Sequence, residues 1–157
     1  MIPQKIIRFL EDRASLGFAG TRDGNLVPSG HRVPGWHVDQ SGRTLTVFMP
    51  DASAPRLLEA LRDNGRIAVT FEEVGTHETY QVKGRYLSHR PVQPAEIEIA
   101  DAARERFAKG LRSLNNDEQV IALITASVPA PGLAVEIGVE DVFVQTPGPG
   151  AGTRIAP

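Results

Sequence analysis

The chain has 157 residues, of which 41% are hydrophobic and 23% are charged, and its formal net charge at pH 7 is −2. This composition is that of an ordinary globular domain long enough to bury a core, and the near balance of charge argues against a dedicated nucleic-acid-binding protein. The absence of cysteine excludes disulfides, thiolate metal sites and a cysteine nucleophile. Because no apolar run is long enough for a signal peptide or a membrane span, we expect a cytoplasmic protein with one domain over residues 1–157.

The first half of the chain combines helical and strand-like segments. Residues 3–13 carry apolar side chains at helical spacing, and residues 15–21 form a short apolar run that ends at a turn signal. Residues 26–38 and 43–49 follow as strands, the second rich in β-branched side chains. Because short turns link these three strands, we expect them to pair as an antiparallel meander. Residues 50–65 predict a short helix.

The second half of the chain continues this mixture. Residues 117–126 fit a helix or a strand, and the Gly/Pro-rich residues 147–157 predict an irregular tail. About six strands, mostly antiparallel and with helices inserted between them, predict a mainly β fold, a barrel with peripheral helices. We also expect two strands at residues 66–73 and 78–89, joined by a hairpin loop, a long helix at residues 93–114 and a closing strand at residues 133–146.

The segment LVPSGHRVPGWHV, residues 26–38, holds two of the four histidines and the only tryptophan. In one extended strand His31 and His37 share a face, with Arg32 on the other, and lie roughly 20 Å apart. That separation is too large for one metal ion, and no cluster with ligand spacing occurs elsewhere, so we expect no metal site. The two prolines indicate an edge, a bulge or a break. The segment fits either a solvated edge strand or one wall of a ligand pocket.

The helix start DASAPR, residues 51–56, follows a strand directly. The free N–H groups of a helix start favour a phosphate and Arg56 adds a bidentate donor, although Pro55 removes one N–H and Asp51 adds negative charge. The alternative is an ordinary helix, capped by Asp51 or Ser53, with a surface arginine. Serine-hydrolase, phosphate-loop and dinucleotide-binding motifs are absent.

The segment TYQVKGR is expected to alternate as a strand. Tyr80 and Val82 then point into the barrel, and Gln81 and Lys83 lie on the polar face. Gly84 indicates a bulge or a close approach of another backbone.

The elements follow in the order helix, the strands FAGTRDG, LVPSGHRVPGWHV and TLTVFM, the helix APRLLEALRDNG, and the strands RIAVTF and TYQVKGR. This order resembles that of the pyridoxamine 5′-phosphate oxidase-like FMN-binding split-barrel proteins. The resemblance covers about residues 5–90 and continues through VFVQTPGPGAG. It implies a six-stranded antiparallel split barrel and a homodimer with two FMN sites at the interface, each lined by both subunits. The implied contacts are His31, Arg32, Val33, Met49 and Pro50 to the ring and ribityl chain, Ser53 and Arg56 to the phosphate, and Gln81 and Lys83 from the partner subunit.

The function that the resemblance implies is an FMN-dependent oxidoreductase of unassigned substrate, whose flavin carries the redox chemistry. Arg32 or Lys83 near the pyrimidine edge would stabilise an anionic reduced flavin, and His31 could relay a proton; no residue is assigned a catalytic role. The phosphate segment of this family usually has a serine followed closely by two basic residues, whereas SAPR has one base and a proline. Two alternatives stay open: a non-catalytic module that binds flavin or haem, and a dimeric scaffold with a degenerate site.

Overall fold

The computed structural model describes residues 1–156, apart from the side chain of Ala54. Most of the expected elements occur within a few residues of their predicted bounds. The elements in chain order are α1 (Gln4–Asp12), β1 (Ser15–Arg22), β2 (Pro28–Val33), β3 (Gly35–Val38), β4 (Thr44–Met49), the 3-10 turn η1 (Asp51–Ser53), α2 (Ala54–Asn64), β5 (Arg66–Glu73), β6 (Thr79–Pro91), α3 (Pro94–Ser113), α4 (Glu118–Ala126), β7 (Leu133–Val144) and β8 (Arg154–Ala156).

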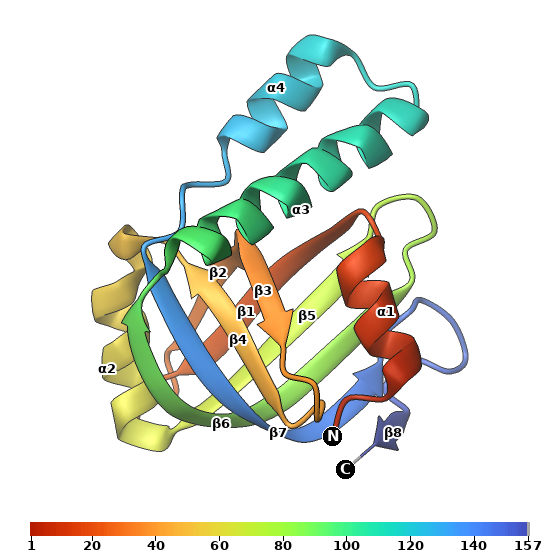
Figure 1. Ribbon diagram of the computed structural model, residues 1–157. Coiled ribbons are helices and arrows are strands. Elements are labelled where there is room, and N and C mark those ends of the chain that lie inside the picture. Colours follow the sequence, from red (N-terminus) through yellow and green to blue (C-terminus); the bar gives the residue numbers. More distant parts are fainter. Residues whose placement is uncertain (157) are drawn as a thin grey trace.

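The eight strands form one antiparallel sheet that curls on itself (Figure 1). The hydrogen-bonded order is β2-β1-β5-β6-β7-β4-β3, and β8 pairs with β7. Although β2 and β3 lie at opposite ends of this order, the curl brings β2 back against β4. The fold is therefore the mainly β split barrel with peripheral helices that the sequence predicted, with eight strands rather than six.

The segment 26–38 forms two strands, and not the single strand expected. Pro34 has no N–H and cannot continue the hydrogen-bond ladder of a sheet. The strand therefore ends there, and its two halves pair with different neighbouring strands. β2 pairs with β1, whereas β3 pairs with β4 at the other edge of the sheet. Both antiparallel pairings expected for residues 26–38 occur, the first half with β1 and the second half with β4, but the break at Pro34 separates them, so the three segments do not form one continuous meander. His31 and His37 consequently belong to different strands.

The C-terminal segment 147–157 is also more regular than predicted. Within it β8 pairs with the end of β7, and the Arg154 guanidinium lies 2.5 Å from the Asp141 carboxylate. Pro157 lies outside the described residues. A three-residue strand has too few alternating positions to be recognised in a Gly/Pro-rich sequence.

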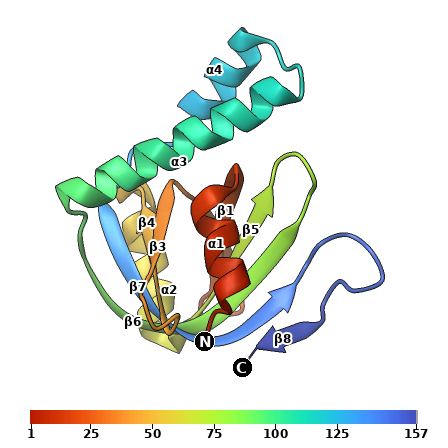
Figure 2. The same cartoon turned by 45° about the vertical axis from the view of Figure 1, so that its right-hand side comes forward.

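The inner face of the sheet and α1 enclose the main hydrophobic core. The ring of Phe9 meets the ring of Tyr80 edge-on, with centroids 5.0 Å apart, and the indole N–H of Trp36 donates to the Leu10 carbonyl at 3.0 Å. Tyr80 and Val82 are buried, as their alternation in the strand predicted. α1 thus closes one side of the curled sheet (Figure 2).

Gly84 marks both a bulge and a close approach, as predicted. The register between β6 and β7 shifts between Lys83 and Gly84. A Cβ at Gly84 would lie 2.2 Å from the carbonyl oxygen of Gly138. The strands can pair here only because this residue has no side chain.

α3 and α4 form an outer layer (Figure 2). A Cβ at Gly35 would lie 2.9 Å from the Cα of Ala100, so a glycine in β3 lets α3 pack closely. The ambiguous residues 117–126 form the helix α4, whose N-cap Asp117 accepts a hydrogen bond from the Gln119 N–H at 2.7 Å. No helix within residues 1–156 is long and apolar enough to cross a membrane.

Candidate functional site

His31 lies on the inner side of the edge strand β2, where the register pairs it with the buried Ala19. Its Nε2 lies 2.6 Å from the Ser29 hydroxyl. Burial, and then the positive charge of Arg56, lower the pKa of His31 below its ordinary value, so the imidazole is neutral at neutral pH. The start of α2 thus lies close enough to β2 for the charge of Arg56 to act on His31. We call His31, Ser53 and Arg56 the β2–α2 corner.

The start of α2 supplies the second half of this corner. Ser53 occupies the N-cap position but its side chain makes no capping hydrogen bond, and Pro55 lies in the first turn. Arg56 is exposed and belongs to none of the ion pairs found within residues 1–156. Asp51 lies against Gly132, where a Cβ would be 2.0 Å from its Oδ1. The corner therefore presents a hydroxyl, a guanidinium and a neutral imidazole.

Three of the predicted site residues are buried beside the corner. Val33 is 4% exposed, Met49 is 0% exposed, and Pro50 is buried as well. The carbonyl of Met49 accepts from the Gly132 N–H at 2.9 Å, and that of Pro50 accepts from the Ser53 N–H at 3.0 Å. The Pro50 carbonyl thus holds the end of η1, whereas Val33 and Met49 belong to the main hydrophobic core.

Arg32 points to the other side of β2 from His31, as strand alternation predicts. Its guanidinium carbon lies 5.7 Å from the centroid of the Phe18 ring, and its Nη1 donates to the Ser127 hydroxyl at 2.9 Å. Ser127 caps the C-terminus of α4. Arg32 thus links the outer face of the sheet to the outer helical layer rather than to the β2–α2 corner.

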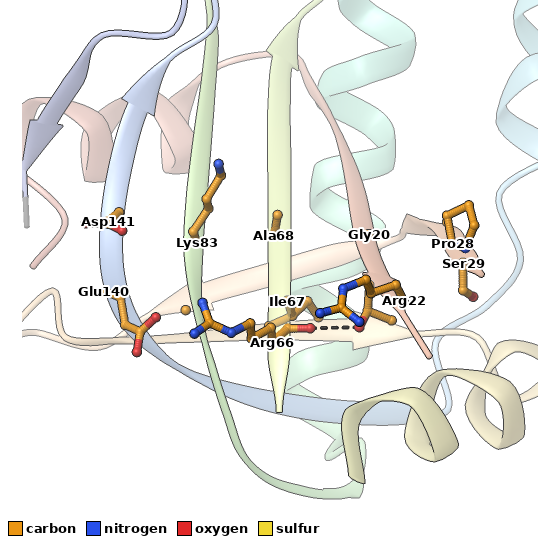
Figure 3. A pocket seen from close by; sticks show the side chains of 13 residues that line it. Gly20, Arg22, Pro28, Ser29, Arg66, Ile67, Ala68, Lys83, Glu140 and Asp141 are labelled. Carbon is orange, nitrogen blue, oxygen red and sulfur yellow. Dashed lines mark hydrogen bonds between the residues drawn. The ribbon is translucent and has the colours of Figure 1, made fainter. Parts of the chain in front are cut away.

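A groove of about 500 Å³ runs over the outer face of β2, β1, β5, β6 and β7 (Figure 3). Small residues occupy facing positions, since Gly30 pairs with Gly20 and Gly20 pairs with Ala68. Lys83 pairs with Ala68 and continues the row. A Cβ at Gly20 or Gly30 would meet no atom within 4 Å, so the floor is open. The charged side chains along the groove are those of Arg22, Arg66, Lys83, Glu140 and Asp141.

Gln81 and Lys83 both lie on this outer face, but only Lys83 lines the groove. Gln81 donates from Nε2 to the Thr70 hydroxyl at 2.9 Å. The Lys83 ammonium lies 4.5 Å from the centroid of the Phe143 ring. Within one chain, the structure places these two residues on the opposite face of the sheet from His31.

The small residues of the groove floor were missed in the sequence. Gly20, Gly30 and Ala68 come from three different strands, and each looks like an ordinary strand residue by itself. Only the register places them in one row. A signal was present, since each occupies an outward position in its strand where a larger polar residue is usual.

Ser29 connects the two surfaces, because it lines the groove while its hydroxyl contacts His31. The β2–α2 corner has the chemistry of a phosphate site: a guanidinium, a hydroxyl and the N–H groups of a helix start. The groove, with an apolar floor and charged sides, suits a planar ring or an opposing protein face.

Solved structures share this fold at low sequence identity. HupZ from Group A Streptococcus is 16% identical, with a TM-score of 0.57 over 97% of this chain and 100% of its own. An F420 reductase is 14% identical, with a TM-score of 0.55 over 90% of this chain and 98% of its own. A pyridoxamine 5′-phosphate oxidase-related, FMN-binding protein from Nostoc punctiforme is 15% identical, with a TM-score of 0.52 over 96% of this chain and 87% of its own.

No protein-family model matches the chain, and no curated protein matches it in sequence. What the chain shares with the solved structures is the arrangement of its strands and helices over nearly its whole length. The resemblance stated from the sequence is confirmed at this level: the chain has the split-barrel fold of the pyridoxamine 5′-phosphate oxidase-related proteins.

Proposed function

We propose that the protein binds a phosphorylated flavin-type cofactor, FMN or a deazaflavin, and uses it in an oxidation–reduction reaction. The observation that carries this proposal is the β2–α2 corner, where the uncapped start of α2 presents Ser53 and the charge of Arg56 acts on His31, although the two segments are separated in the chain. Two solved structures with the same fold bear names that include FMN binding and F420 reductase. Both names refer to flavin-type cofactors that carry phosphate.

The residues present fit such a cofactor at its phosphate end. Arg56 offers a bidentate donor free of ion pairs within residues 1–156, and Ser53 offers a hydroxyl that does not cap its helix. The neutral imidazole of His31 can take up a proton when a phosphate dianion lies beside it, because a nearby negative charge raises the pKa of a histidine. The flavin supplies hydride or electron transfer when bound.

The proposed assembly is a homodimer in which the outer faces of two sheets meet. Phe18 is a large apolar residue that is 48% exposed on this face, and the glycines and alanine of the groove floor allow another backbone to approach closely. Gln81 and Lys83 then reach the cofactor of the partner subunit, as the resemblance implies. This arrangement reconciles their position on the outer face with a role in a shared site.

The absorbance spectrum of the purified protein tests the cofactor. We expect a yellow protein with flavin bands, or a deazaflavin band after incubation with F420, that bleach on reduction. A haem spectrum would support the tetrapyrrole-binding alternative and contradict the proposal. Protein that stays colourless after incubation with FMN or F420 would support the scaffold alternative.

A further inference from the structure

A second cleft, of about 250 Å³, lies at the β3 edge of the sheet, between α1, β3 and α3. Figure 2 shows these three elements next to one another, with α3 above α1 and β3. The base of the cleft is apolar, since Leu10, Trp36 and Val38 are 0%, 7% and 5% exposed and Ile99 adds a wall. The cleft shares no lining residue with the groove or with the β2–α2 corner.

Ionisable side chains from three elements surround this apolar base: Glu11 from α1, His37 from β3 and Arg106 from α3. Neither Glu11 nor Arg106 belongs to an ion pair found within the part of the chain that the structure describes. The Nε of Arg106 is buried and has no hydrogen-bond partner there. Glu11 and Arg106 therefore line one cleft with opposite charges and without an ion pair to each other.

The backbone of β3 adds hydrogen-bonding groups to the same cleft. Among the strands that the structure describes, β3 pairs with β4 alone, and the Asp39 N–H donates to the Thr44 carbonyl at 3.0 Å. Bonded residues alternate along an antiparallel strand, so His37 bonds toward β4 while the N–H and C=O groups of Trp36 and Val38 point to the open edge. No hydrogen bond to these backbone groups occurs among residues 1–156.

We propose that this cleft binds a free α-amino acid with an apolar side chain. The carboxylate pairs with Arg106, the ammonium pairs with Glu11, and the side chain packs on Trp36. The free edge of β3 satisfies the remaining polar groups of the ligand. The volume lies below the roughly 300–1,000 Å³ of sites for drug-sized ligands, which restricts the occupant to a small molecule.

Trp36 is the only tryptophan of the chain, so its fluorescence reports directly on the cleft. We expect L-leucine to change the Trp36 emission of the full-length protein saturably, with a Kd of about 1 mM or lower. The amide signals of Trp36 and Val38 in a nitrogen–proton NMR spectrum should shift in the same titration. Two analogues that lack one charge each, 4-methylpentanoate and 3-methylbutylamine, should bind at least tenfold more weakly.

Variants of the charged residues complete the test. Arg106→Gln and Glu11→Gln should each weaken L-leucine binding at least tenfold, whereas Lys109→Gln, which removes an exposed cation from the same helix, should leave it unchanged. Absence of any saturable change in both fluorescence and the amide signals would overturn the proposal. Equal binding of L-leucine and 4-methylpentanoate would overturn the assignment of an amino acid.

Discussion

At the scale of single residues, the site depends on Arg56, which lies in the first turn of α2 and lowers the pKa of His31. Removing the guanidinium leaves a hydroxyl and an imidazole to hold a phosphate. Both remaining groups are uncharged at neutral pH, because burial keeps the pKa of His31 low. Among the three residues of the corner, we therefore expect the loss of Arg56 to weaken phosphate binding most.

We predict that Arg56→Ala weakens FMN binding by about 1.5–3 kcal/mol, the usual contribution of a hydrogen bond to a charged group. Titration of the apoprotein with FMN, followed by flavin fluorescence, measures this change. Arg62→Ala is the matched control, since Arg62 is an exposed arginine on the same helix. A Kd that stays the same in Arg56→Ala would place the phosphate elsewhere.

Gly84→Ala should lower the free energy of unfolding by about 3 kcal/mol or more, because its Cβ would collide with backbone rather than with a movable side chain. Gly150→Ala serves as the control, since its Cβ would meet no atom within 4 Å and the residue lies outside the sheet and the groove. Chemical denaturation of both variants gives the comparison. If the two variants are equally stable, the β6–β7 bulge adapts to a side chain.

At the scale of elements, the start of α3 is fastened to the end of β6 by an ion pair. The Arg90 guanidinium donates two hydrogen bonds of 2.7 Å to the Glu96 carboxylate, which also accepts from the Gln93 N–H. These hydrogen bonds, of which those from Arg90 contribute most, hold the pKa of Glu96 below its ordinary value, although burial alone would raise it. Glu96 is 8% exposed, so the carboxylate has little water to replace these partners.

Glu96→Gln should therefore destabilise the fold by about 1.5–3 kcal/mol at neutral pH. A carboxyl group whose pKa is lower in the folded than in the unfolded protein stabilises the fold at any pH above its unfolded pKa. This stabilisation is lost as the pH falls through the pKa of the folded state. The difference between the two proteins should shrink below about pH 4. Unfolding curves at pH 7 and pH 3 measure this difference in unfolding free energy, and Glu98→Gln, at an exposed glutamate, is the control. If Glu96→Gln is destabilised equally at both pH values, the loss comes from packing and not from the ion pair.

At the scale of the whole molecule, the curl of the sheet turns one face inward and leaves the other open. The inner face, α1 and α2 enclose the core, whereas the outer face carries the groove and the exposed Phe18. A second copy placed on this outer face would cover both features. The oligomeric state is thus the property of the whole molecule that the proposed function depends on most directly.

We predict a homodimer at micromolar concentration and its dissociation by Gly20→Arg. The monomer has room for this side chain, since a Cβ at Gly20 would meet no atom within 4 Å, but a long cation would prevent close approach of a partner. Gly150→Arg, at an equally open glycine outside the sheet, is the control. Sedimentation velocity of the three proteins measures this; a wild-type monomer would contradict the shared-site arrangement.

Several parts of this protein could be predicted from the sequence because they rest on local patterns. The helical spacing of α1, the alternation that buries Tyr80 and Val82, and the glycine at the β6 bulge are each visible within one segment. The residues 117–126 could not be assigned, because their apolar content fits both kinds of element. The capping hydrogen bond of Asp117 favours the helix, which then packs against α3.

The sequence by itself determined the class of the fold, the faces of the strands and the candidates for a phosphate site, since these follow from side-chain periodicity and from the residue types at a helix start. Only the tertiary structure decided that Pro34 sends β2 and β3 to opposite edges, that the charge of Arg56 acts on His31, and that Gly20, Gly30 and Ala68 share one row. The physical reason is that strand pairing and sheet curl join segments distant in the chain, and no local pattern encodes which edges meet.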